Sequence, residues 1–127
     1  MRLGLRARRA PRAARAESRL SRTEEQAGAV FAALADPTRR EIAQLLASDG
    51  PLTQTELARR LPITRQGVAK HLAALQEAGL VEPTRAGRES RFALTPAPFA
   101  TAALWMAALG AEWDARLHAL RRLLERG

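Results

Sequence analysis

The stretch that most constrains the fold runs from Thr55 to Val81, TELARRLPITRQGVAKHLAALQEAGLV. Its apolar residues recur at helical spacing on both sides of a four-residue corner, Leu61-Pro62-Ile63-Thr64. Pro62 ends the first helix because proline has no N–H to donate, and Thr64 caps the second helix. Two short amphipathic helices joined by so tight a corner are typical of a helix-turn-helix.

The second of these helices keeps one face polar. A turn of about 100° per residue places Gln66, Lys70 and Ala73 opposite its apolar residues. Arg65 lies at one flank of this face and His71 at its boundary with the core. Such a face suits the DNA major groove, where glutamine can bond adenine and arginine can bond guanine. The alternative is a face that is only solvated, and the next segment of the chain helps to decide between the two.

A β-hairpin with a basic tip is predicted directly after this helix. In LVEPTRAGRESRFALT, two short runs flank Ala86-Gly87, with apolar Phe92 and Leu94 at alternate positions. The arginines near the predicted tip are Arg85, Arg88 and Arg91. A helix-turn-helix followed by a basic wing is much more specific than either part alone, so the sequence favours DNA binding.

Capping signals divide the rest of the chain into helices. Ser21 and Glu24 fit a capping box, so order is expected to begin near Ser21. Asp36-Pro37 starts the next helix, and Thr53 with Glu56 forms a further capping box. The sequence therefore predicts a mainly α fold with five or so helices and a small β-hairpin wing, which is a winged helix-turn-helix.

The last predicted helix runs from Pro98 to about Arg126 and is roughly 43 Å long at 1.5 Å per residue. A domain of about 100 residues has a radius of gyration of only about 13 Å, so it cannot cover such a helix. Large exposed apolar patches mark interfaces, so the sequence predicts a homodimer. The predicted interface residues are Val30, Phe31 and Leu34 on the first helix and Trp105, Leu109, Trp113, Leu117 and Leu120 on the last.

The net charge is +8, and most of it lies at the N-terminus. Residues 1–22 hold eight arginines and one glutamate, a net of +7, whereas residues 23–127 hold 13 basic and 12 acidic side chains, a net of +1. Residues 1–20 are therefore expected to form a disordered basic tail, and residues 21–127 the folded domain. Three interpretations of the tail stay open: an arm that contacts phosphates, an Arg-rich transit peptide, and sequence upstream of the true start codon.

The composition argues against several other classes of protein. The chain has no cysteine, so it can form neither a disulfide nor a thiolate metal site. No apolar run approaches the roughly 18 residues that span a bilayer. No catalytic triad or phosphate-binding glycine loop is recognisable, so we expect the protein to be no enzyme and to use no cofactor. As a DNA-binding protein it is expected to be cytoplasmic and nucleoid-associated. The alternative function is a winged-helix module that holds a protein and binds nucleic acid only nonspecifically.

The stretch ALADPTRREIAQLLASDGPLTQTELARRLPITRQGVAKHLAALQEAGLV, with the later GRESRFAL, resembles the ArsR/SmtB family of bacterial winged-helix repressors. The resemblance covers about residues 24–95, and the last helix is similar to that of a non-metal branch. It implies a homodimeric repressor that binds a palindromic operator in double-stranded DNA. It places DNA contacts at Thr64, Arg65, Gln66, Lys70 and His71, and wing contacts at Arg88 and Arg91. Gly67 departs from the family pattern, where alanine or proline is usual.

Many members of that family respond to metals, so the metal-binding positions need separate inspection. The resemblance places two cysteines, two residues apart, after Glu-Leu in the third helix, but here Ala58 and Arg60 follow Glu56-Leu57. The last helix offers Asp114 and His118, an i,i+4 pair that is predicted to be a surface ion pair. Zinc takes at least three protein ligands even in open sites, so no metal site is predicted.

Overall fold

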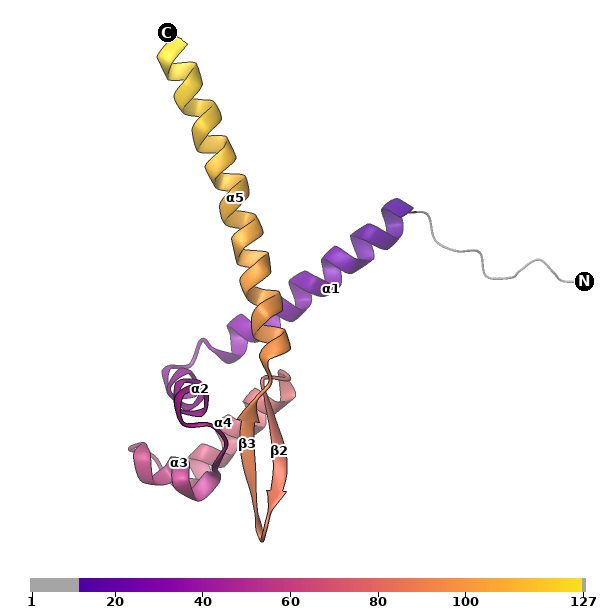
Figure 1. Cartoon of the computed structure of the whole chain (residues 1–127). Helices are drawn as coiled ribbons and strands as arrows, with labels where there is room; N and C mark the ends of the chain where they lie inside the picture. The colour runs from indigo at the N-terminus through magenta and orange to yellow at the C-terminus, as the bar shows by residue number, and fades with distance from the viewer. Residues whose placement is uncertain (1–11, 127) are drawn as a thin grey trace, which may run out of the picture.

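The structure, a computed structural model, describes residues 12–126 of the 127-residue chain, and side chains from Arg22 onward. In this part of the chain, five helices accompany a three-stranded antiparallel sheet. The elements are α1 (Arg12–Ala33), α2 (Pro37–Asp49), β1 (Leu52–Thr53), α3 (Gln54–Arg60), α4 (Arg65–Glu77), β2 (Val81–Ala86), β3 (Glu89–Leu94) and α5 (Pro96–Arg126). The β2–β3 hairpin, which we call the wing, projects from one end of the molecule, and α5 extends from the other (Figure 1). The predicted mainly α winged helix-turn-helix is confirmed.

Local capping explains where most of the helices begin. Asp36 accepts hydrogen bonds from the first backbone N–H groups of α2, and Pro37 occupies the first helical position. Thr53 and Glu56 form the predicted capping box at the start of α3. The Thr64 hydroxyl accepts a bond of 3.0 Å from an N–H of the first turn of α4. These starts are confirmed because each depends on residues within four positions of one another.

The first helix begins earlier than predicted. The backbone is already helical from Arg12, so the predicted start at a Ser21 capping box is wrong. The segment RAARAESRL is rich in alanine, arginine and leucine, which have high helix propensity, and this outweighs the repulsion of its like charges. The predicted boundary between residues 20 and 21 therefore falls inside α1, while residues 1–11 of the predicted tail lie outside the described residues.

The sheet has one strand more than the predicted hairpin. Strand β1 pairs with β3, opposing Leu52 to Phe92, and the sheet order is β1-β3-β2. A two-residue strand is too short to show alternation, so nothing in the sequence announces it. The β2–β3 ladder closes at Ala86 opposite Glu89, and Gly87 takes a φ of +68° in the turn, a conformation that suits glycine. The middle of β3 is thus fixed to the segment between α2 and α3.

The core is formed where the helices and the sheet meet. Its fully buried larger side chains are Ile42, Leu57, Val68, Leu72, Leu75 and Leu80. Val30 is only 2% exposed, so it belongs to this core. Its prediction as an interface residue is wrong, because almost none of its surface remains for a second chain. Among residues 12–126, no helix combines the length and apolar character needed to cross a membrane.

Helix α5 leaves the core soon after it begins. It packs against α1 near its own start, and Ala102 is its one buried residue within the described chain. A single residue, Thr95, separates it from β3, and the Thr95 N–H donates to the carbonyl oxygen of Leu80 at 2.9 Å. At 1.5 Å per residue the helix is about 46 Å long, so most of it stands free of the domain (Figure 1). We call residues 106–126 the stalk.

Candidate nucleic-acid interface

The outer face of α4 has the residues that the sequence analysis placed there. Arg65, Gln66, Lys70 and Ala73 are all exposed, while the apolar side of the helix lies in the core. The predicted rotation of the helix about its axis is therefore confirmed. The first turn also leaves backbone N–H groups at a positive dipole end, which favours anions.

Three of the predicted contact residues have partners inside the protein: Thr64 and His71, described here, and Arg65, described below with Glu89. The hydroxyl oxygen of Thr64 accepts a hydrogen bond from the N–H of Gly67, as a helix cap. His71 is half-buried, and its Nδ1 accepts a bond from Nε of Arg39 at 3.3 Å. Arg39 also donates to the carbonyl oxygen of Ala33 at 3.1 Å, so it connects the end of α1 with α4. The sequence analysis missed Arg39, because the contact spans 32 positions.

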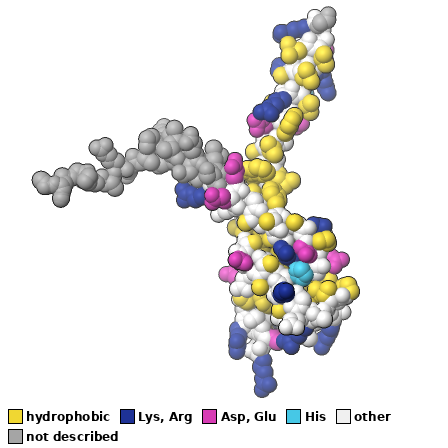
Figure 2. Space-filling model, turned by 180° about the vertical axis from the view of Figure 1, so that it is seen from behind, with side chains coloured by type: hydrophobic (Ala, Val, Ile, Leu, Met, Phe, Trp, Pro, Cys, Tyr) yellow, Lys and Arg dark blue, Asp and Glu magenta, His cyan; other side chains and the backbone are white. Residues whose placement is uncertain are grey.

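The wing arginines do not share one face. Arg85, Arg88 and Arg91 are all exposed, but only Arg88 lies in the turn. Arg85 opposes Ser90, whereas Arg91 lies one position further along β3 and therefore points to the other side of the ladder. Lys and Arg side chains gather at the end of the molecule that carries the wing (Figure 2).

The Arg91 side of the wing faces the capping box of α3. Hydrogen bonds from Thr53 hold the pKa of Glu56 below its usual value, and the charges of Arg91 and Arg60 act in the same direction. At the start of α2, burial acts to raise the pKa of Asp36. The backbone N–H groups that it accepts from outweigh this effect, so its pKa is also lowered.

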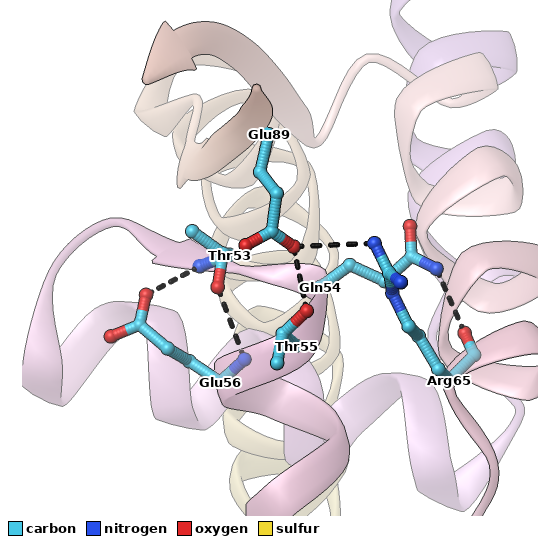
Figure 3. A network of polar contacts seen from close by, with 6 residues as sticks. All are labelled: Thr53, Gln54, Thr55, Glu56, Arg65 and Glu89. Carbon is cyan, nitrogen blue, oxygen red and sulfur yellow. Dashed lines mark hydrogen bonds and ion pairs between the residues drawn. The ribbon is translucent and has the colours of Figure 1, made fainter. Parts of the chain in front are cut away.

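Glu89 connects the wing with both helices of the helix-turn-helix (Figure 3). Its Oε1 accepts a hydrogen bond of 2.6 Å from the Thr55 hydroxyl and another of 3.3 Å from Nη2 of Arg65. The Gln54 side chain donates to the backbone carbonyl of Arg65 at 3.0 Å. The sequence analysis missed Glu89, since nothing along the chain joins residues that lie 24 and 34 positions apart.

One of the positions considered for metals already has a charged partner. Arg60, where the resemblance placed a thiolate in other members, forms an ion pair with Asp49 at the end of α2. The predicted ion pair between Asp114 and His118 is wrong; the ion pair in this part of α5 joins Arg116 and Glu112, at 3.0 Å, on the other side of the helix. No cluster of three or more potential metal ligands exists among the described residues.

The predicted dimer residues fall into two groups. Phe31 and Trp105 contact each other within the chain, with ring centroids 5.9 Å apart, and Leu34 is half-buried against the core. The stalk residues are exposed instead: Leu109, Trp113, Leu117 and Leu120. Hydrophobic side chains follow the free length of α5 (Figure 2).

A helix-turn-helix with an exposed polar second helix and a flanking basic hairpin defines a winged helix-turn-helix protein, a class that binds DNA. A family model described as a helix-turn-helix domain matches residues 34–84. The HTH-type transcriptional regulator YuzN of Bacillus subtilis (strain 168) is 47% identical over 66 residues, which are 47% of this chain and 72% of YuzN. The regulator Rv2034 of Mycobacterium tuberculosis (strain H37Rv) is 48% identical over 64 residues, 50% of this chain and 59% of its own length.

A solved structure supports the same assignment. An ArsR-like transcriptional regulator from Rhodococcus sp. RHA1 is 44% identical, with a TM-score of 0.72 over 80% of this chain and 94% of that protein. The chain belongs to the ArsR family of winged helix-turn-helix transcriptional regulators. It is therefore a DNA-binding regulator and not an enzyme.

Proposed function

We propose that this regulator is a homodimeric repressor that binds a palindromic operator and does not respond to metal ions. The observation that carries the proposal is the exposed polar face of α4, which lies beside the basic wing in a molecule with an uncovered apolar stalk. The face supplies the means to recognise bases, and the stalk supplies the means to pair two such faces.

Base reading is assigned to the first two turns of α4. Gln66 can bond adenine through both ends of its amide, and Lys70 offers a charge one turn further along. Ala73 is small, so the helix backbone can approach the groove closely. Arg88, in the exposed turn of the wing, is assigned a phosphate contact, which fixes orientation without reading sequence.

Pairing of two chains is assigned to the stalk. Trp113, Leu117, Leu120 and Leu124 are spaced by four, three and four positions, which is the seam of a two-helix coil. Each of them is more than half exposed in the single chain. Large exposed apolar stripes mark interfaces, and a second copy offers a stripe of the same length. A two-fold axis would set two α4 helices into major-groove segments about one helical turn apart.

Indifference to metals follows from the donor atoms on offer. The chain has no cysteine, and Ala58 and Arg60 stand where thiolates would be needed. Arg60 also forms an ion pair with Asp49, so a paired cation stands where a metal ligand would be needed. Zinc, cadmium or arsenite should therefore leave operator affinity unchanged in a binding titration. A stoichiometric metal in the purified protein, with chelation altering operator affinity, would contradict this.

The operator can be found by selecting duplexes from a random pool with the purified full chain and sequencing those that stay bound. We expect two inverted half-sites about one helical turn apart, occupied by two chains per duplex in sedimentation analysis. The matched control is the same duplex with one half-site scrambled, which should bind much more weakly. An unenriched pool, or one chain per duplex, would refute the proposed function.

A further inference from the structure

An acidic side chain in the middle of a proposed phosphate-binding surface needs an explanation. Glu89 follows Arg88 directly and lies two positions before Arg91 on the wing. A carboxylate at this point repels phosphates, so it weakens the attraction of any DNA duplex. Its presence is understandable if it does something that sequence-independent attraction cannot do.

The contacts of Glu89 show what it holds. One carboxylate oxygen accepts from Thr55 on α3 and from Arg65 on α4, while the residue itself belongs to β3 (Figure 3). The Thr55 bond is short, at 2.6 Å, and fixes the carboxylate against the helix-turn-helix. The Arg65 contact uses Nη2, and the Arg65 side chain stays 61% exposed. The guanidinium is thus tethered at one nitrogen and open to an approaching duplex with the others.

The backbone of Arg65 is also restrained, by a side chain of α3. The Gln54 amide donates to its backbone carbonyl at 3.0 Å, so α3 and β3 fix its backbone and its side chain respectively. An unrestrained arginine side chain has several rotatable bonds, whose freedom is lost when it makes a contact. A tethered arginine loses less conformational freedom on binding. It therefore binds a duplex more tightly in the geometry in which it is held, and no more tightly in other geometries.

From this arrangement we propose that Glu89 is a specificity-determining residue that acts by positioning Arg65. Its tether prepares Arg65 for the contact that the operator offers, and its negative charge opposes duplexes that bring phosphates there in another register. Both effects increase the ratio of operator affinity to random-DNA affinity, since specificity is a difference between two binding free energies. This role rests on the proposed function, because it presupposes a preferred duplex.

The test compares the full chain with the variants E89A and E89Q on the selected operator and on a scrambled duplex. E89A should lower the affinity ratio by roughly threefold to tenfold, the range open to one partly exposed charged contact. E89Q keeps an oxygen that can accept from Thr55 and Arg65, so it should recover part of the lost operator affinity. The matched control is E82A, which removes an exposed carboxylate from β2 of the same wing and should leave the ratio unchanged.

A double-mutant cycle separates positioning from bulk charge. In the R65A background, the E89A substitution should no longer lower operator affinity, because there is no guanidinium left to hold. Thermal unfolding of each variant checks that the wing has kept its fold, and E89Q decides the outcome if E89A does not fold.

Three results would overturn the role of Glu89. These are an unchanged ratio in both variants, an equal fall of the ratio in E82A, and an undiminished effect of E89A without Arg65. A wild-type chain that selects no sequence would instead remove the proposed function, and this role with it. If the wild type binds selectively and E89A has the same ratio of operator affinity to random-DNA affinity, only the role of Glu89 would be removed.

Discussion

The helix-turn-helix core and the stalk have the same kind of amphipathic pattern but opposite environments. In the core, Leu57 and Leu75 have no exposed surface, whereas Leu117 on the stalk is 55% exposed and Leu124 is 73% exposed. Both segments repeat apolar residues every three or four positions, so pattern alone does not distinguish them. What differs is the availability of a covering surface: the same chain supplies one for the stripe of α4 and none for the stripe of the stalk.

The comparison shows that an apolar stripe indicates that a helix face becomes buried, but not whether the covering surface belongs to the same chain or to another one. Burial of apolar surface contributes about 25 cal/mol per Å², whether the covering surface is intramolecular or not. Core burial should therefore be independent of protein concentration, and stalk burial should depend on it. The predictions below test this distinction, beginning with the largest expected effect.

Truncation in the core should destabilise the fold itself. Leu72 is 2% exposed on the inner side of α4, and Leu72→Ala should cost about 2–5 kcal/mol of unfolding free energy through lost burial and a cavity. Urea denaturation followed by circular dichroism measures this loss. It should be the same at low and high protein concentration. A loss that disappears at high concentration would mean that α4 also depends on a partner chain.

A charge on the stalk should separate the chains without unfolding the core. Leu120→Glu should convert dimers to monomers in sedimentation equilibrium and weaken operator binding by about a hundredfold, since two linked contacts become one. Ala115→Glu is the control, because it adds the same charge to the exposed side opposite the seam. Equal effects of the two substitutions would show that charge, and not the apolar seam, governs the result.

Shortening a side chain on the outer face of α4 should affect DNA alone. Gln66→Ala should cost about 1–3 kcal/mol of operator binding and relax the preference at one base pair. Thermal stability should hardly change, because the side chain is exposed. Operator binding as tight as that of the wild type would mean that another part of α4 enters the groove.

Acid should weaken the helix starts before it affects the stalk seam. The folded chain holds the pKa of Glu56 below its usual 4.5 and that of Asp36 below 3.8. A lowered carboxyl pKa contributes stability that is complete above the unfolded value and lost as the pH falls through the folded value. The urea midpoint should thus decline below about pH 4, and less steeply in Glu56→Gln. Identical pH profiles would exclude Glu56 as a source of the decline.

Much of the fold could be predicted because its signals are local. Asp36, Thr53 and Thr64 act on N–H groups within three positions, and Gly79 takes a φ of +78° after Ala78, the C-cap of α4. Such signals are complete within a few letters of sequence. The outer face of α4 could be predicted for the same reason, since helical spacing alone determines which residues oppose the core.

The unpredicted features depend on contacts between distant segments. Arg39 reaches His71, and Glu89 reaches Thr55 and Arg65, through packing that no periodicity encodes. Val30 was mispredicted for the same reason. Its helical spacing fits an interface residue as well as a core residue, and only the folded structure shows that its neighbours belong to the same chain. The early start of α1 has a different cause. The residues before Ser21 have high helix propensity, so the helix begins upstream of the plausible capping box at Ser21.

The single residue between β3 and α5 makes the wing and the stalk the two arms of one lever. Thr95 is held at the pivot by its bond to Leu80. The arms are unequal, because the stalk side is about 46 Å long and a six-residue hairpin is about 20 Å long. Because β1 and Glu89 hold the wing to the rest of the domain, the domain would have to turn with α5 as one rigid body. A rotation of that kind that moves the far end of α5 by about 4 Å would move the wing tip by under about 2 Å, which is still enough to break a hydrogen bond to a phosphate. If two stalks pair as proposed, small adjustments at their contact would thus reach the DNA reduced in size but not lost.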